Sequence, residues 1–155
     1  MAKKPSTRPA QPRVYIVDDE WDIAETLAAI LSRNGFLAQA FHSPNRALVR
    51  ALDQPPDILL TDVMMPDLSG LDLAIALRRA GLPCRILLFS GQPDAASLLL
   101  DAHHRGYDFE LLDKPLHPMQ LLLRLRNTTS PRTAPSEDPV EETVADPTAN
   151  TVPAA

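Results

Sequence analysis

Short apolar runs alternate with amphipathic stretches along the middle of the chain. The apolar runs predict buried β-strands. They cover residues 14–19, 36–41, 57–62, 84–90 and 109–114. After each run, apolar residues recur at helical spacing. These stretches cover 21–35, 43–52, 69–81, the segment around 93–106, and 117–126. The order predicts five strands, each followed by a helix.

The predicted strands are mostly continuous apolar runs rather than alternations of apolar and polar residues. This is expected where helices cover both faces of a parallel sheet. The pattern therefore predicts an α/β fold, a doubly wound five-stranded parallel sheet with five flanking helices. In such sheets the ligand crevice lies outside the carboxyl ends of the strands. The polar residues and glycine at those ends are Asp18, Asp19, Asp62, Ser90, Gly91 and Lys114.

Composition places the boundaries of the predicted domain. The chain has 155 residues, of which 45% are hydrophobic and 23% charged, as in a soluble globular protein. Residues 1–12 are polar and basic and predict a disordered leader, whereas 13–126 hold all the periodic segments. Residues 127–155 are acidic, rich in Pro, Thr and Ala, and lack aromatic residues. They predict a disordered tail, with a docking role as the alternative.

Several classes of protein are disfavoured by the same composition. No apolar run approaches the roughly 20 residues that cross a bilayer, and the N-terminus has no apolar core of a secretory signal. Cys84 is the single cysteine, which excludes an internal disulfide and suits a reducing compartment. A net charge of −5 argues against nucleic-acid binding. We therefore expect a cytoplasmic protein that binds neither membrane nor nucleic acid.

The residues at the strand ends form a specific chemical set. Three carboxylates, those of Asp18, Asp19 and Asp62, would repel one another without a cation. Hard oxygen ligands favour Mg²⁺, and a carboxylate beside a metal ion is able to attack a phosphoryl group. Lys114 would neutralise one phosphoryl oxygen, and the hydroxyl of Ser90 would donate a hydrogen bond to another.

These motifs together resemble the response-regulator receiver domain, the CheY-like phosphoacceptor of two-component signalling. They are VDDE after the first strand, TDVMMPDLSG at the third, FSG after the fourth and DKP after the fifth. The resemblance covers the whole 13–126 core and implies a flavodoxin-like sheet with strand order 2-1-3-4-5. It also implies that Asp62 accepts a phosphoryl group from the phosphohistidine of a histidine kinase.

The resemblance assigns further roles. The groups that would hold Mg²⁺ are the carboxylates of Asp18 (often through water), Asp19 and Asp62 and the backbone carbonyl of Met64. Ser90 and Lys114 would sense the aspartyl phosphate, and the Lys114–Pro115 peptide bond would be cis. Met64 and Gln92 stand at positions that tune the rate of hydrolysis in the family. Gly70 is expected to give the backbone freedom at a helix start.

One position departs from the family pattern. Receivers usually carry an aromatic residue three positions before the lysine, where this chain has Leu111. Phe109, two residues earlier on the same side of the strand, is the candidate switch aromatic. We expect the loops after Asp62 and Ser90, with the helix that follows, to form the switch instead or as well.

The sequence leaves alternatives open. We expect a stand-alone receiver without an output domain, acting on an unknown downstream protein and existing as a monomer or a phosphorylation-dependent dimer. It would not be an enzyme, apart from slow self-dephosphorylation. A phosphorelay intermediate that passes phosphate to a histidine phosphotransfer protein and a purely structural pseudo-receiver are the alternatives. A phosphohydrolase of the haloacid dehalogenase type would need a second acid where Met64 stands.

Overall fold

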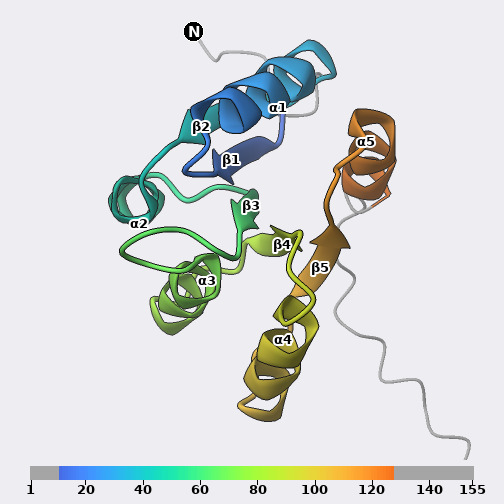
Figure 1. The fold of residues 1–155 in the computed structure, drawn as a ribbon. Helices are drawn as coiled ribbons and strands as arrows, with labels where there is room; N and C mark the ends of the chain where they lie inside the picture. Colours follow the sequence, from blue (N-terminus) through green and yellow to red (C-terminus); the bar gives the residue numbers. More distant parts are fainter. Residues whose placement is uncertain (1–10, 128–155) are drawn as a thin grey trace, which may run out of the picture.

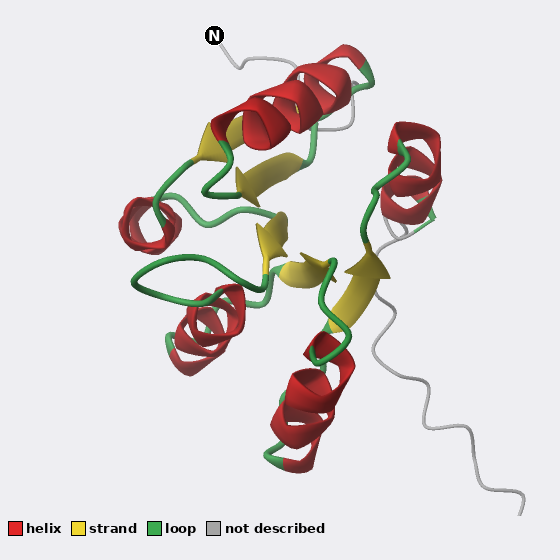
Figure 2. Ribbon diagram, viewed as in Figure 1, coloured by secondary structure: helices red, strands yellow, loops and turns green. Residues whose placement is uncertain are grey.

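The chain forms a parallel β-sheet with helices on both faces (Figures 1 and 2). The computed structural model describes residues 11–127, so the predicted leader and tail lie almost wholly outside the described residues. The strands are β1 (Arg13–Val17), β2 (Leu37–Phe41), β3 (Ile58–Asp62), β4 (Arg85–Ser90) and β5 (Glu110–Asp113). The helices are α1 (Trp21–Arg33), α2 (Pro44–Asp53), α3 (Gly70–Arg79), α4 (Ala95–His104) and α5 (Pro118–Arg126). The sheet order is β2-β1-β3-β4-β5, which confirms the predicted fold class and strand order.

Two apolar cores cover the two faces of the sheet. Successive strand residues point to opposite faces, so Ile16 and Leu60 pack toward α1 and α5, whereas Tyr15 and Leu59 pack toward α2, α3 and α4. The helices divide in the same way in Figure 1, with α1 and α5 on one side of the sheet. Every residue of the central strand β3 is buried. Burial on both faces explains why the strands are continuous apolar runs in the sequence.

The predicted strands extend slightly too far at the functional edge. β1 ends at Val17 and β5 at Asp113, although both segments were predicted to continue into the polar residues. The backbone N–H of Asp18 still donates to the carbonyl of Phe41 at 3.1 Å, so the chain leaves the sheet only after this residue. Asp18 therefore starts its loop from a fixed position.

Side-chain caps fix the starts of two helices. The hydroxyl of Ser43 accepts a hydrogen bond from the N–H of Arg46 at the start of α2. The hydroxyl of Ser69 accepts one from the N–H of Asp72 at 3.0 Å, which anchors α3 directly after the β3–α3 loop. These bonds satisfy N–H groups that have no partner within the helix.

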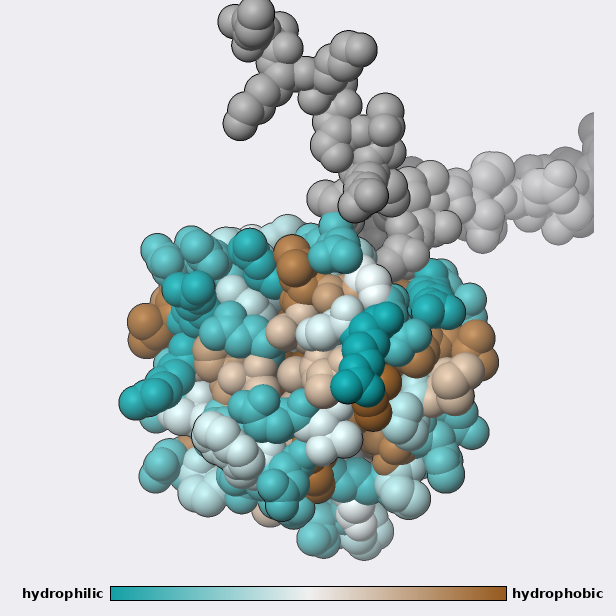
Figure 3. Space-filling model, turned by 90° about the horizontal axis from the view of Figure 1, so that it is seen from above, coloured by the Kyte–Doolittle hydropathy of each residue, from teal (hydrophilic) through white to brown (hydrophobic). Residues whose placement is uncertain are grey.

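The longest helix of the described residues, α1, has 13 residues. In the described part of the chain, no helix is both long and apolar enough to cross a membrane. On the face shown in Figure 3, hydrophobic residues reach the surface at separate places among hydrophilic ones.

Candidate functional site

Three carboxylates converge at the carboxyl ends of two neighbouring strands. Asp18 and Asp19 follow β1, Asp62 ends β3, and these strands pair directly. One carboxylate oxygen from each residue lies within 4.8 Å of the others. Asp18 and Asp62 are buried and Asp19 is exposed. The structure therefore brings together the three acids predicted from the sequence, with one of them open to solvent.

Lys114 supplies the positive charge of the site. Its Nζ donates a hydrogen bond to Oδ2 of Asp62 at 2.9 Å and lies 3.8 Å from Oδ2 of Asp18. Burial lowers the pKa of Lys114, but the hydrogen bond and the negative charge of Asp62 outweigh it, so the pKa lies above its ordinary value. The backbone N–H of Lys114 donates to the carbonyl of Ser90, and the Lys114–Pro115 peptide bond is cis. The lysine is thus held in its charged form beside the acids.

Asp18 is incompletely satisfied in its buried position. Its Oδ1 accepts a hydrogen bond from the N–H of Glu20 at 2.9 Å, whereas its buried Oδ2 has no hydrogen-bond partner among the described residues. Burial raises the pKa of Asp18 to about 6; the charge of Asp62 adds to the rise, while the bond from Glu20 and the charge of Lys114 oppose it. A buried oxygen without a partner is costly. A divalent cation at this position would satisfy it.

The donor set fits a hard divalent cation. The carboxylates of Asp18, Asp19 and Asp62 form the group that is able to hold a metal ion in the described part of the chain. Oxygen ligands from acids at this spacing suit Mg²⁺ or a similar ion. The buried Oδ2 of Asp18, which has no hydrogen bond among the described residues, is the observation that favours a cation over three merely adjacent acids.

Backbone groups of the loop after Asp62 fix the position of this acid. Oδ1 of Asp62 accepts a hydrogen bond from the N–H of Met64 at 3.1 Å, and the N–H of Gly70 donates to the carbonyl of Val63. A Cβ at Gly70 would lie 1.8 Å from the carbonyl oxygen of Asp62. The glycine is required by this close approach and not, as predicted, by a backbone conformation closed to other residues, because its φ is not positive.

Ser90 lies buried at the end of β4, next to the acids. Asp62 pairs with Phe89 in the β3–β4 register, which places Ser90 one step beyond it. The Ser90 hydroxyl oxygen accepts a hydrogen bond from the N–H of Gln92 at 3.0 Å. Because a hydroxyl accepts and donates at the same time, its proton stays available for a phosphoryl oxygen. The side chains of Met64 and Gln92 are exposed on the two loops around the site.

The aromatic candidate Phe109 lies away from this group. It precedes β5, while Lys114 follows it, so about 16 Å of extended chain separates the two residues. The Phe109 ring stacks with Tyr107 and lies 5.9 Å below the guanidinium carbon of Arg78. Phe109 points to the same side of the strand as Leu111, but it lies too far back along the strand to reach the site. Leu111, which stands at the family's aromatic position, is half-buried against the same apolar core as Phe109.

An aromatic residue that the sequence analysis did not single out does contact the lysine. The ring of Phe89 is fully buried, and its centroid lies 5.2 Å from Nζ of Lys114. The signal in the sequence is its position directly before Ser90 at the end of a strand. The contact is a cation–π interaction and adds a second restraint on the lysine.

Comparison with known proteins places this geometry in a family. The model of the response regulator receiver domain matches residues 14–126. The response regulator MprA of Mycobacterium avium is 35% identical over 126 residues, which are 81% of this chain and 54% of that protein. The DNA-binding response regulator MtrA of Mycolicibacterium smegmatis is 30% identical over 115 residues, which are 74% of this chain and 49% of that protein. The chain spans about half the length of these curated relatives.

Solved structures show the same fold. The receiver domain of the Francisella response regulator 1452 has a TM-score of 0.66 at 25% identity, covering 76% of this chain and 95% of that one. The Vibrio cholerae chemotaxis protein CheY4 has a TM-score of 0.68 at 23% identity, covering 76% of this chain and 98% of that one. With five parallel strands in the order 2-1-3-4-5 and a family match across the described domain, the chain belongs to the response-regulator receiver family.

Proposed function

We propose that Asp62 accepts a phosphoryl group from the phosphohistidine of a histidine kinase. The observation that carries this proposal is the environment of its carboxylate: Lys114 lies at 2.9 Å, and two further acids lie within 4.8 Å. A structural carboxylate would be satisfied by the lysine alone and would gain nothing from two acidic neighbours. A carboxylate that reacts beside a metal cation needs the lysine to neutralise the phosphoryl group and the two acids to hold the cation.

The residues present perform the transfer as follows. An oxygen of Asp62 attacks phosphorus, a P–O bond forms, and the P–N bond to the donor imidazole breaks, with the electron pair leaving on the ring nitrogen. Lys114 gives up its bond to Asp62 and neutralises a phosphoryl oxygen. The Ser90 hydroxyl donates a hydrogen bond to another phosphoryl oxygen while it still accepts one from Gln92.

Mg²⁺ is the cofactor that we propose for this site. The carboxylates of Asp18, Asp19 and Asp62 and the backbone carbonyl of Met64 would hold it. It would offset the negative charge of the carboxylates and of the transferred phosphoryl group.

The phosphorylated state acts as a signal and is not an intermediate of catalytic turnover. Each chain takes one phosphoryl group, and slow self-dephosphorylation resets it. Its partners would be a histidine kinase or a histidine phosphotransfer protein, and a downstream protein that reads the altered surface. The weakly buried helix α4 and the loops after Asp62 and Ser90 form that surface in this proposal.

Intact-mass measurement after incubation with acetyl phosphate and Mg²⁺ tests the proposal. We expect the protein to gain one phosphoryl mass, and Asp62→Asn to gain none. Asp67→Asn, which changes an exposed acid in the same loop, is the matched control and keeps the gain. An unmodified wild-type protein would support a pseudo-receiver, and release of many phosphates per chain would support a phosphohydrolase.

A further inference from the structure

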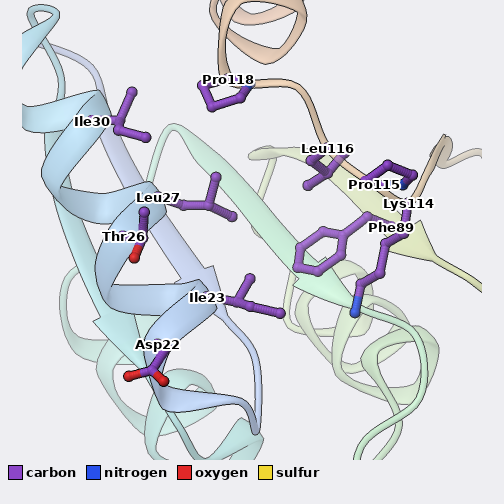
Figure 4. A pocket seen from close by; sticks show the side chains of 10 residues that line it. All are labelled: Asp22, Ile23, Thr26, Leu27, Ile30, Phe89, Lys114, Pro115, Leu116 and Pro118. Atoms are coloured by element: carbon purple, nitrogen blue, oxygen red, sulfur yellow. The ribbon is translucent and has the colours of Figure 1, made fainter.

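A cavity of about 650 Å³ lies between α1 and the segment that joins β5 to α5 (Figure 4). Its lining residues are Asp22, Ile23, Thr26, Leu27, Ile30, Phe89, Lys114, Pro115, Leu116 and Pro118. Sites for small molecules usually measure roughly 300–1,000 Å³ and are lined mainly by apolar side chains with a few polar groups. The cavity has this size and composition, and the proposed phosphoryl chemistry uses only Lys114 from its lining.

The polar and apolar parts of the lining are separated along the cavity. Its α1 wall runs from Asp22 to Ile30, about 12 Å of helix. Figure 4 shows Ile30 and Pro118 at one end, and Asp22 and the Lys114 ammonium group toward the other. Phe89 lies between them. An elongated occupant with an apolar body and one polar head matches this distribution.

The charges at the polar end select the sign of that head group. Lys114 already has acidic partners, with Asp62 at 2.9 Å and Asp18 at 3.8 Å. Asp22 is exposed, and no ion pair joins it to another of the described residues 11–127. An anionic head would have to take the lysine from Asp62 and approach uncompensated acids. A cationic head instead meets the carboxylate of Asp22, which has no ion-pair partner among these residues and lies on the α1 wall, opposite the wall that carries Lys114 (Figure 4).

We propose that this cavity binds a small amphipathic amine, with a hydrocarbon or aromatic body and one protonated amino group. The body lies between α1 and Leu116, over the ring of Phe89, and the ammonium group pairs with Asp22. The hydroxyl of Thr26, one helical turn along, accepts a hydrogen bond from the same group. The proposal does not depend on the phosphorylation of Asp62, and either is able to fail without the other.

Methyl NMR titrations of the full chain with three probes of equal body test the head group. The probes are hexylamine, hexanol and hexanoate at neutral pH. We expect saturable shifts of the methyl groups of Ile23, Leu27 and Ile30. Hexylamine should bind about three- to fivefold more tightly than hexanol, as for a partly exposed ion pair, and hexanoate more weakly than both.

Variants on α1 separate the charge from the cavity. Asp22→Asn should reduce the preference for hexylamine over hexanol to less than about twofold. Glu25→Gln is the matched control, because Glu25 contacts His42 and does not line the cavity. Thr26→Trp, at an exposed helix position, should fill the cavity and remove the shifts for all three probes.

Three results would overturn the proposal. One is the absence of saturable shifts at these methyl groups for any probe. Another is that the three probes bind equally and that Asp22→Asn does not change their affinities, which would indicate nonspecific adsorption. The third is tighter binding of hexanoate, which would assign the polar end to Lys114 as an anion site.

Discussion

At the scale of single residues, Asp18 is a position where the proposed metal-binding role opposes stability. Its carboxylate is fully buried, one of its oxygens has no hydrogen-bond partner among the described residues, and burial raises its pKa from 3.8 to about 6. Between these two pH values the folded chain keeps a proton that the unfolded chain has released. The free energy of unfolding therefore falls as the pH rises through this interval.

Asp18→Asn should for this reason stabilise the protein when no metal is present. At neutral pH in the presence of a chelator, we expect the free energy of unfolding to rise by about 1–3 kcal/mol, the range that follows from a pKa shift of this size. Below pH 3.8 the difference between variant and wild type should vanish. Urea unfolding at the two pH values measures both. A variant that is less stable than wild type at neutral pH would show that the carboxylate is well satisfied.

Gly70 is a position where an added side chain would collide with the backbone of Asp62. Gly70→Ala places a Cβ 1.8 Å from the carbonyl oxygen of Asp62, so either the loop or α3 must move. We expect a loss of at least about 2 kcal/mol in the free energy of unfolding. Gly91→Ala is the matched control: there a Cβ would lie 3.7 Å from Cβ of Lys114, an ordinary contact, and the loss should stay below about 1 kcal/mol. Equal losses in the two variants would mean that the approach at Gly70 relaxes easily.

At the scale of elements, an ion-pair group connects β4, β5 and α5. Glu110 accepts two hydrogen bonds from the guanidinium of Arg85, at 2.6 and 2.9 Å, and Arg124 lies 3.5 Å away. The hydrogen bond from Arg85 lowers the pKa of Glu110, against the opposing effect of burial. Because its pKa is lowered, Glu110 adds to the free energy of unfolding at pH values above 4.5, its ordinary pKa. This contribution disappears as the pH falls through the pKa of the folded state.

Glu110→Gln should therefore destabilise the protein only at neutral pH. Because the group is partly exposed, the expected loss is about 0.5–1 kcal/mol, and it should fade in acid. Thermal unfolding across a pH series measures the loss. Asp101→Asn, at an exposed acid on α4, should change neither the size nor the pH dependence of stability. A loss that persists unchanged in acid would assign the effect to packing instead of charge.

Helix α4 is the least anchored helix at the functional edge. Only Ala95 and Ala102 of its residues are buried, and Leu98 and Leu100 are exposed. The hydrogen bond from Gln92 to the Ser90 hydroxyl links the start of this segment to the site. A switch needs an element with two arrangements of similar energy, and α4 has little buried surface to hold it in one.

Hydrogen exchange with beryllofluoride and Mg²⁺, a mimic of the phosphoryl group, tests this assignment. We expect amide exchange to slow in the loops 63–69 and 91–94 and to change along α4. Strand β2, at the far edge of the sheet, is the internal control and should be unaffected. The same exchange rates in these loops and α4 with and without the mimic would exclude them as the switch.

At the scale of the whole molecule, the fold was predictable because its pattern is repeated. Five apolar runs, each followed by a helical stretch, leave few topologies, and the family resemblance gave the strand order. The acids and the lysine were predictable as a group because parallel strands place their carboxyl ends at one edge. The burial of each acid was not predictable: Asp18 and Asp19 are adjacent in the sequence, but Asp18 is buried and Asp19 is exposed. Nor was the contact of Phe89 with the lysine predictable, since it depends on how β4 and β5 pair. The separation of Phe109 from the lysine, by contrast, follows from their spacing along the chain.

The most direct test of the account is to locate the phosphoryl group within the chain. After phosphorylation with acetyl phosphate and Mg²⁺, borohydride reduction converts an aspartyl phosphate to homoserine, which peptide mass spectrometry then places. We predict homoserine at position 62 and unmodified aspartate at positions 18 and 19. Homoserine at either of those positions, or at none of the three, would contradict the assignment of Asp62 as the phosphoacceptor.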